Sequence, residues 1–281
     1  MPSTLPSLSI HCSSSSTNLP LSLQTDVVKP QHLFLREKIV CLETIGIDSG
    51  KALSRNPSLR VSSLQSLNSV ISFLRSKGIH HKDMPRIFGM CPKILTSDIE
   101  AEIDPVFRFL SHELRVPECR FRRVINKCPR LLSSGVETQL RPALDYLKSI
   151  GFWNLKSLAY QDPILLVSSV ERTLIPKLRY LESIGFQGRQ AAGMVLRCPG
   201  LFTFSIENNF KPKFSYFEKE IKGSDLEELR GFPQYFAFSL EKRIKPRHRE
   251  VVRNGVEMRL PAMLKSTDDE FQNLIRGGRG G

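Results

Sequence analysis

The stretch Asn126-Lys-Cys-Pro-Arg-Leu-Leu132 decides the fold of this chain, because related stretches recur along the sequence. Each clear copy has a proline followed within three residues by an apolar pair, and a weaker copy is Asn56-Pro-Ser-Leu59. The core prolines are Pro57, Pro92, Pro129, Pro163, Pro199 and Pro233. They are separated by 35, 37, 34, 36 and 34 residues. A period of this size, kept over five clear copies, is the signature of a solenoid built from one supersecondary unit.

The residues before each core proline follow the spacing of an amphipathic helix. Apolar side chains stand one, four, five and eight positions before the proline, as in Met84, Ile87, Phe88 and Cys91. This is the i, i+3, i+4, i+7 pattern of a helix with one buried side. The proline ends this helix because it lacks an N–H group and crowds the preceding turn. We expect the apolar pair that follows, such as Leu131-Leu132, to fill the joint between helices.

A second helix is predicted to begin about five residues after each core proline. A glutamate lies eight residues after every clear core proline, and Ser97, Ser134 and Ser168 lie five residues after the first three. Serine followed by glutamate three positions later is a capping box, which satisfies free backbone N–H groups at a helix start. In the last two copies, Ser205 and Ser239, one position later, are the expected caps.

The second helix contains a proline of its own, thirteen residues after the core proline. These prolines are Pro105, Pro142, Pro176, Pro212 and Pro246. An interior proline costs about 3 kcal/mol and kinks a helix. Its recurrence predicts a systematic bend that sets the curvature of the array. The helix then ends at a glycine such as Gly151 or Gly185, the usual left-handed cap.

These features resemble the mitochondrial transcription termination factor (mTERF) family. The resemblance is carried by the Cys-Pro-x-Leu-Leu-like cores, the second proline, the Leu-x-Ser-Ile-Gly-Phe helix ends and the closing segment Met263–Phe271. It covers roughly residues 40–275, and Asp162 and Phe232 depart from it where other copies have cysteine. The resemblance implies an all-α, curved, superhelical solenoid shaped like half a doughnut. It also implies nucleic-acid binding and regulation of gene expression in an organelle.

The chain is predicted to have three parts. Residues 1–35 form an organelle transit peptide that is disordered, because Met1–Thr25 is rich in serine and contains no charged residue apart from His11. The first arginine is Arg36, which favours chloroplast over mitochondrion; a plain disordered tail is the other interpretation. Residues 36–275 form the repeat array. Residues 276–281, Arg-Gly-Gly-Arg-Gly-Gly, form a flexible tail of the kind that contacts single strands, or simply a solvated end.

The net charge of +13 comes from 41 Lys and Arg against 28 Asp and Glu. A basic solenoid offers a long positive track, and neutralising phosphates releases counterions. Basic residues recur beside the second prolines and before the core prolines, although such positions are often merely solvated. The candidate phosphate contacts are Lys127, Arg141, Lys177, Arg179, Arg197, Lys211, Lys213, Lys242, Arg243, Lys245, Arg247 and Arg249.

Other classes of site are not indicated. The six cysteines contain no Cys-x-x-Cys pair, and three of them occupy one repeat position on an apolar face, which predicts core packing rather than disulfides. His80 and His81 are adjacent and point apart, so metal ligation is not expected. The sequence has no phosphate-binding glycine loop, no catalytic Ser-His-Asp arrangement and no apolar run near the ~18 residues that span a membrane. We therefore expect no enzyme activity, no cofactor and no membrane contact.

Three functional hypotheses remain open. The first is a plastid regulator that binds double-stranded DNA along a basic groove and directs or terminates transcription. The second places RNA in the same groove, for intron splicing or transcript processing. The third is a protein-binding scaffold, since solenoids often bind partners on a concave side. Further partners would be plastid transcription or splicing proteins, and we expect a monomer.

Overall fold

The structure, a computed structural model, describes residues 30–221 and 225–278, with side chains from residue 35 onward. Within these residues the chain is all-α, with helices and tight helical turns and no strand. The α-helices are α1 (Pro30–Thr44), α2 (Ser49–Arg55), α3 (Leu64–Ser76), α4 (Met84–Met90), α5 (Asp104–His112), α6 (Phe121–Lys127), α7 (Arg141–Ser149), α8 (Leu155–Gln161), α9 (Ile175–Ser183), α10 (Gly188–Arg197), α11 (Lys211–Glu220), α12 (Leu226–Gly231), α13 (Lys245–Arg253), α14 (Leu260–Lys265) and α15 (Asp268–Gly277).

Each of the five clear repeats consists of a short first helix, a 3₁₀ turn that begins at the core proline, a π-helical turn and a second α-helix, whereas the weaker copy at Pro57 passes from its 3₁₀ turn to α3 without a π-helical turn. The 3₁₀ turns are Pro57–Arg60, Pro92–Thr96, Pro129–Ser133, Pro163–Leu165, Pro199–Thr203 and Pro233–Ala237. The π-helical turns are Ile99–Ile103, Val136–Leu140, Val170–Leu174, Ile206–Phe210 and Leu240–Ile244. Two further 3₁₀ turns, His81–Asp83 and Glu118–Arg120, lead into α4 and α6.

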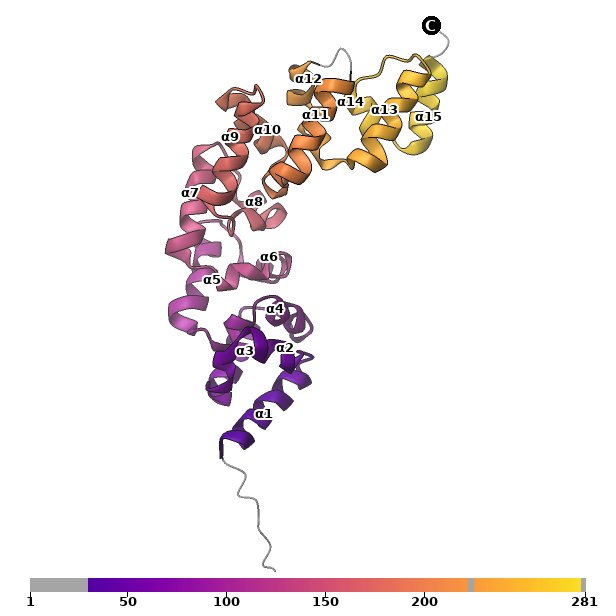
Figure 1. Cartoon of the computed structure of the whole chain (residues 1–281). Helices are drawn as coiled ribbons and strands as arrows, with labels where there is room; N and C mark the ends of the chain where they lie inside the picture. The colour runs from indigo at the N-terminus through magenta and orange to yellow at the C-terminus, as the bar shows by residue number, and fades with distance from the viewer. Residues whose placement is uncertain (1–29, 222–224, 279–281) are drawn as a thin grey trace, which may run out of the picture.

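The repeats stack into a curved array (Figure 1). Second helices α5, α7 and α9 lie along its outer side, and first helices α4, α6 and α8 lie along the inner side. The array bends after α9, so that α11, α13 and α15 continue in a new direction (Figure 1). This arrangement confirms the predicted solenoid.

The core is continuous along the array because the first helices bury most of the predicted apolar stripe, although Leu155 of α8 and Leu226 of α12 are only partly buried. In α6, Phe121, Val124 and Ile125 are at most 1 % exposed. The apolar pair Leu131-Leu132 is also buried, at 0 % and 2 %. Burying a side chain of this size stabilises the fold by about 1.5–3 kcal/mol. The sequence pattern therefore identified the inward side of the first helix and the joint correctly.

The second proline occupies the second position of each second α-helix, directly after the π-helical turn. In that turn the amide of Ile103 donates to the carbonyl oxygen of Asp98, five residues back, at 3.2 Å. The same i−5 bond joins Leu140 to Gly135. A wider turn gives room to the proline ring, which would crowd a carbonyl in a regular α-helix. The predicted irregularity at this proline thus takes the form of one π-helical turn per repeat.

The caps of the first three second helices lie one residue later than predicted. Asp98 Oδ1 accepts from the Ala101 amide at 2.7 Å, and Ser169 Oγ accepts from the Arg172 amide at 3.1 Å. Gly135 takes the equivalent place without a side-chain bond. The hydroxyls of Ser97, Ser134 and Ser168 donate backward to carbonyl groups four residues earlier. In the last two repeats Ser205 and Ser239 are caps, as predicted.

Left-handed residues end the second helices. Gly151 and Gly185 have φ of 108° and 109°, which confirms the predicted glycine caps. Helix α5 has no glycine at this place, and Arg115 adopts φ 56° instead. The buried Val116 follows it, as Phe152 follows Gly151. An arginine thus carries a conformation that glycine adopts without strain.

The boundaries of the array differ slightly from the predicted ones. Helix α1 begins at Pro30, inside the predicted targeting segment, and residues 1–29 lie outside the described residues. At the other end Arg276 and Gly277 belong to α15, so the predicted tail begins within a helix, and its last three residues are not described. None of the helices in the described part of the chain combines the length and apolarity required to cross a bilayer.

Candidate nucleic-acid interface

Several predicted phosphate contacts lie in the joints between repeats. Lys177 and Lys213 stand fourteen residues after their core prolines, and Lys213 is only 6 % exposed. Its ammonium group donates to the carbonyl oxygen of Phe236 in the next repeat at 2.5 Å, and Lys177 donates likewise to Phe202. Burial lowers the pKa of Lys213 to about 8 and also lowers the pKa of Lys177. The ammonium groups of these lysines thus already have partners in the 3₁₀ turns of the next repeat.

The same arrangement exists at the start of the array. Lys38, which is 3 % exposed, donates to the carbonyl oxygens of Leu59, Arg60 and Ser62 at 2.7–2.8 Å. These carbonyls end the first 3₁₀ turn and have no donor within it. A lysine with a flexible stem and three donors is suited to binding several carbonyls at once.

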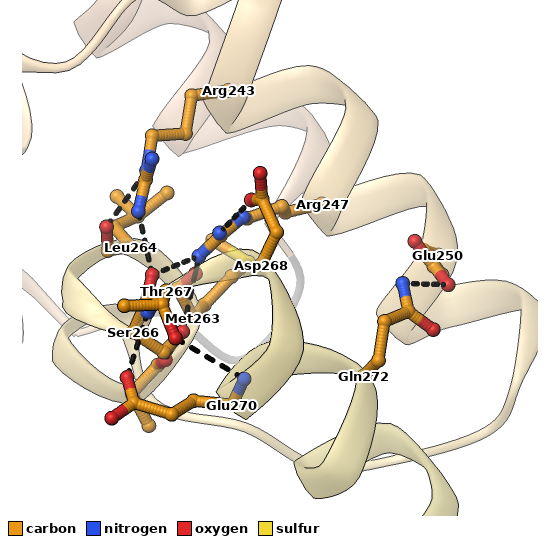
Figure 2. A network of polar contacts seen from close by, with 11 residues as sticks. Arg243, Arg247, Glu250, Met263, Leu264, Ser266, Thr267, Asp268, Glu270 and Gln272 are labelled. Atoms are coloured by element: carbon orange, nitrogen blue, oxygen red, sulfur yellow. Dashed lines mark hydrogen bonds and ion pairs between the residues drawn. The ribbon is translucent and has the colours of Figure 1, made fainter.

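Arg247 fills the equivalent position in the last repeat and holds the C-terminal helices in place (Figure 2). It is 5 % exposed and donates to the carbonyl oxygens of Met263 and Ser266 at 2.7 and 2.9 Å. Its guanidinium group also pairs with Asp268. Arg243 donates to the carbonyl of Ser266 at 2.6 Å (Figure 2). In the basic stretch Lys242–Arg249, Arg243 and Arg247 therefore have a structural role.

Two further predicted contacts are bound to the end of a neighbouring first helix. Lys127 Nζ donates to the carbonyl oxygen of Tyr160 at 3.1 Å, and Arg197 donates to that of Arg230 at 2.5 Å. Arg55 donates to Gly89 in the same way at 2.9 Å. Each donor stands two residues before its core proline and each acceptor three residues before the next, so these bonds fix the register of adjacent repeats.

Glutamates that recur once per repeat form ion pairs with another set of predicted contacts. The glutamate eight residues after the core proline pairs with the basic residue twelve after it, one helical turn away. The pairs are Arg141–Glu137, Lys211–Glu207 and Lys245–Glu241. Arg141 also pairs with Glu113 at 2.6 Å. The row of basic residues expected beside the second prolines thus lies next to a row of glutamates.

Arg179, Lys242 and Arg249 remain as exposed predicted contacts. Within residues 30–221 and 225–278 none of the three forms an ion pair. They lie on second-helix segments of two repeats. Of the other predicted contacts, Lys127, Arg197 and Lys211 are also exposed, but each already has a protein partner.

Between residues 80 and 221 the excess of positive charge lies instead on the first helices and their 3₁₀ turns, whereas α12, the first helix of the last repeat, has two glutamates and one arginine. We call residues 80–96, 117–133, 153–167 and 187–203 the first-helix face. It contains eleven Lys and Arg and only three Asp and Glu. The complementary segments 97–116, 134–152, 168–186 and 204–221 contain ten basic and twelve acidic residues. The two sets of segments thus differ strongly in charge, and the first helices lie on the inner side of the curve (Figure 1).

The exposed basic residues of the first-helix face escaped the sequence analysis because they do not recur at one position in every repeat. Lys93 and Arg130 share the position after the core proline, whereas Arg86, Lys156 and Arg189 each stand elsewhere on their helices. All five are exposed. Counting charge by helix segment, rather than by repeat position, would have identified this face.

Two of the five described cysteines are packing residues, whereas Cys119 is exposed. Cys91 and Cys128 are buried, and none of the five described cysteines is in a disulfide. Burial raises the pKa of the Cys128 and Cys198 thiols, which disfavours the reactive thiolate. Among the described residues no group of three or more His, Cys, Asp or Glu side chains is placed to hold a metal ion.

Comparison with known proteins agrees with this architecture. The mTERF family profile matches residues 31–156 and 153–272. The chain is 39 % identical over 83 residues to "Transcription termination factor MTERF5, chloroplastic" of Arabidopsis thaliana, covering 30 % of this chain and 16 % of that protein. It is 34 % identical over 86 residues to "Transcription termination factor MTERF4, chloroplastic" of the same plant, covering 31 % of this chain and 16 % of that protein.

A third relative, "Transcription termination factor MTERF2, chloroplastic" of Arabidopsis thaliana, is 37 % identical over 87 residues, or 31 % of this chain and 13 % of that protein. Each match thus spans less than one fifth of the relative. The chloroplast location of these relatives confirms the location predicted for this chain. Since the profile covers most of the sequence and the structure shows the repeat that the sequence predicted, the chain belongs to the mTERF family.

Proposed function

We propose that this protein binds nucleic acid in the chloroplast and regulates plastid gene expression, with double-stranded DNA lying along the first-helix face. Family membership supports the class of function. The observation that carries the proposal for the site is the charge of that face, eleven basic residues against three acidic. Regulation or termination of transcription would follow from a protein bound across the path of the polymerase.

The chemistry of the face favours contacts to the backbone of the ligand. Its exposed groups are Lys and Arg, which bind phosphate and release counterions. Phosphate contacts position a protein on a duplex, whereas base contacts specify a sequence. We therefore expect binding that depends steeply on salt and only weakly on sequence.

Charge reversal on the two sides of the repeat tests this proposal. Arg86→Glu, Lys93→Glu and Arg130→Glu together alter the first-helix face. Arg179→Glu, Lys242→Glu and Arg249→Glu together alter the second helices and form a matched control, because both variants change three exposed basic residues to glutamate. For duplex DNA the first change should reduce the salt slope of log K by about 2.7, if each residue neutralises one phosphate.

The control variant should bind duplex DNA almost as the native chain does. A larger loss in the control would instead assign the site to the second-helix residues that the sequence suggested. Titration with RNA of the same sequence separates the two nucleic acids. A well-folded chain that binds neither would favour the protein-scaffold hypothesis.

A further inference from the structure

Trp153 is the one tryptophan of the sequence, and it is 79 % exposed. It stands ten residues before its core proline, directly after the buried Phe152. Other repeats have Lys82, Cys119 and Arg189 at this position, and all of these are exposed. An indole ring in water forgoes the stabilisation that its large apolar surface would gain from burial. The ring is therefore available for contact with a ligand.

The backbone around Trp153 is held in a fixed turn. The Leu155 amide donates to the Trp153 carbonyl oxygen at 3.0 Å. Asn154 Oδ1 accepts from the Ser157 amide at 2.8 Å and caps helix α8. The Cα position of the tryptophan is thus defined by ordered hydrogen bonds, and its ring is presented from the start of α8.

The neighbours of Trp153 along α8 are cationic and aromatic. Lys156, in the first turn of α8, is exposed. Tyr160, one turn further, lies beneath the guanidinium group of Arg123 from α6, 5.3 Å from the ring centroid. Lys156 and Tyr160 are four residues apart and share one side of the helix. An exposed ring thus stands two residues before α8, an exposed ammonium group lies in its first turn, and a guanidinium group is stacked on Tyr160 in its last turn.

This surface differs from a protein-docking site. Aromatic hot spots in protein interfaces lie in well-packed apolar patches. Between residues 80 and 221 the exposed large hydrophobic residues are Met90, Trp153 and Leu196, and Leu196, which is 37 % exposed, lies against Gly151. A single ring with basic neighbours matches the chemistry of nucleic-acid strands, in which a flat base alternates with a negative phosphate.

We propose that Trp153 is a stacking platform for an unpaired base, with Lys156 and Arg123 binding the adjacent phosphates. The ligand is a single-stranded segment, either RNA or one strand of opened DNA. This inference rests on the proposed function, because the first-helix face brings the strand to α8. It adds a contact that a fully paired duplex cannot make, since its bases are stacked on one another.

The lone tryptophan reports on its own site through fluorescence. The full chain would be titrated with single-stranded RNA, single-stranded DNA of the same sequence and the corresponding duplex DNA, each about 12 nucleotides long. Stacking should quench the emission on addition of a single strand, whereas duplex should bind with little quenching. The nucleic acid that quenches at the lower concentration identifies the source of the strand.

Three substitutions separate stacking from apolar contact. Trp153→Ala should weaken single-strand binding about tenfold, the effect of losing one stacked base, and leave duplex binding unchanged. Trp153→Phe should retain most of the affinity, and Trp153→Leu should behave like Trp153→Ala. Circular dichroism melts should be unchanged, because the side chain is exposed.

Two results would overturn the site while leaving the proposed function intact. The first is salt-dependent binding of a single strand with unchanged emission and full affinity of Trp153→Ala. The second is full affinity of Trp153→Leu, which would indicate an apolar contact of the protein-docking kind. If the native chain binds no nucleic acid at all, both the site and the proposed function fail.

Discussion

Lys213 and Phe236 lie in neighbouring repeats, and the lysine ammonium group donates to the phenylalanine carbonyl oxygen at 2.5 Å. Burial lowers the pKa of Lys213 to about 8, against about 10.4 for a solvated lysine. Between these pH values the folded state has a neutral lysine and the unfolded state a charged one. The unfolded state then binds more protons, so the contribution of Lys213 to stability rises with pH from about 8 to about 10.4.

The comparison of the native chain with Lys213→Met isolates this effect. Urea unfolding at a series of pH values from 7 to 10 gives the difference in free energy of unfolding between the two proteins. The native chain should become more stable relative to Lys213→Met as the pH rises above 8, and the difference should be constant below pH 8. A difference that does not vary with pH would show that Lys213 keeps an ordinary pKa in the fold.

Arg247→Ala should destabilise the C-terminal end of the array by about 2 kcal/mol, because it leaves the carbonyl of the buried Met263 without this donor and removes one of the two donors to the Ser266 carbonyl. The matched control is Arg249→Ala on the same helix, which should change stability by less than about 0.5 kcal/mol since Arg249 is exposed. Thermal melts measure both, and hydrogen exchange should localise the loss to α14 and α15. Equal effects of the two substitutions would contradict the structural role of Arg247.

Ser168 and Ser169 are adjacent serines with different roles. Ser169→Ala removes the cap that accepts from the Arg172 amide and should cost about 1 kcal/mol. Ser168→Ala removes only a backward bond to the Ile164 carbonyl and should cost less than about 0.5 kcal/mol. Chemical denaturation of the two variants tests the assignment, and a larger loss from Ser168→Ala would restore the cap expected from the sequence.

Arg115→Gly should stabilise the protein. The substitution removes the strain of a non-glycine residue at φ 56°, about 1–2 kcal/mol, and the greater freedom of glycine in the unfolded chain offsets about 0.5–1 kcal/mol of this gain. The converse change, Gly151→Ala, should destabilise, because φ is 108° and a methyl group would meet Leu196 at 3.0 Å. Melting temperatures that move in the same direction for both variants would contradict this explanation.

The repeat could be predicted from the sequence because its signals depend on residues that are close together in the chain. Proline position and apolar spacing determine where helices end and which side is buried, and both recur in every copy. The caps were placed one residue early because two polar residues stand side by side, as at Ser97-Asp98 and Ser168-Ser169. Local pattern does not decide which of two such residues accepts from the helix.

The charged residues were harder to interpret because periodicity does not separate a solvated residue from a buried one. Lys177, Lys213 and Arg247 recur at one position, as an exposed stripe would. The same position holds Val106 and Ala143 in the first two repeats, and both are fully buried. The apolar residues at this position in the first two repeats were the feature of the sequence that indicated a position facing the core. That a carbonyl of the next repeat would meet the charge follows only from the packed structure.

The π-helical turns have a consequence for the ligand as well as for the protein. Each lies before a proline, whose missing N–H is a covalent property that neither salt nor acidity alters. Because this geometry recurs in every clear repeat, the path of the array is set before any nucleic acid binds. A duplex that lies along the array would have to bend to follow it. DNA sequences that bend readily would therefore dissociate most slowly, even where the protein contacts no base.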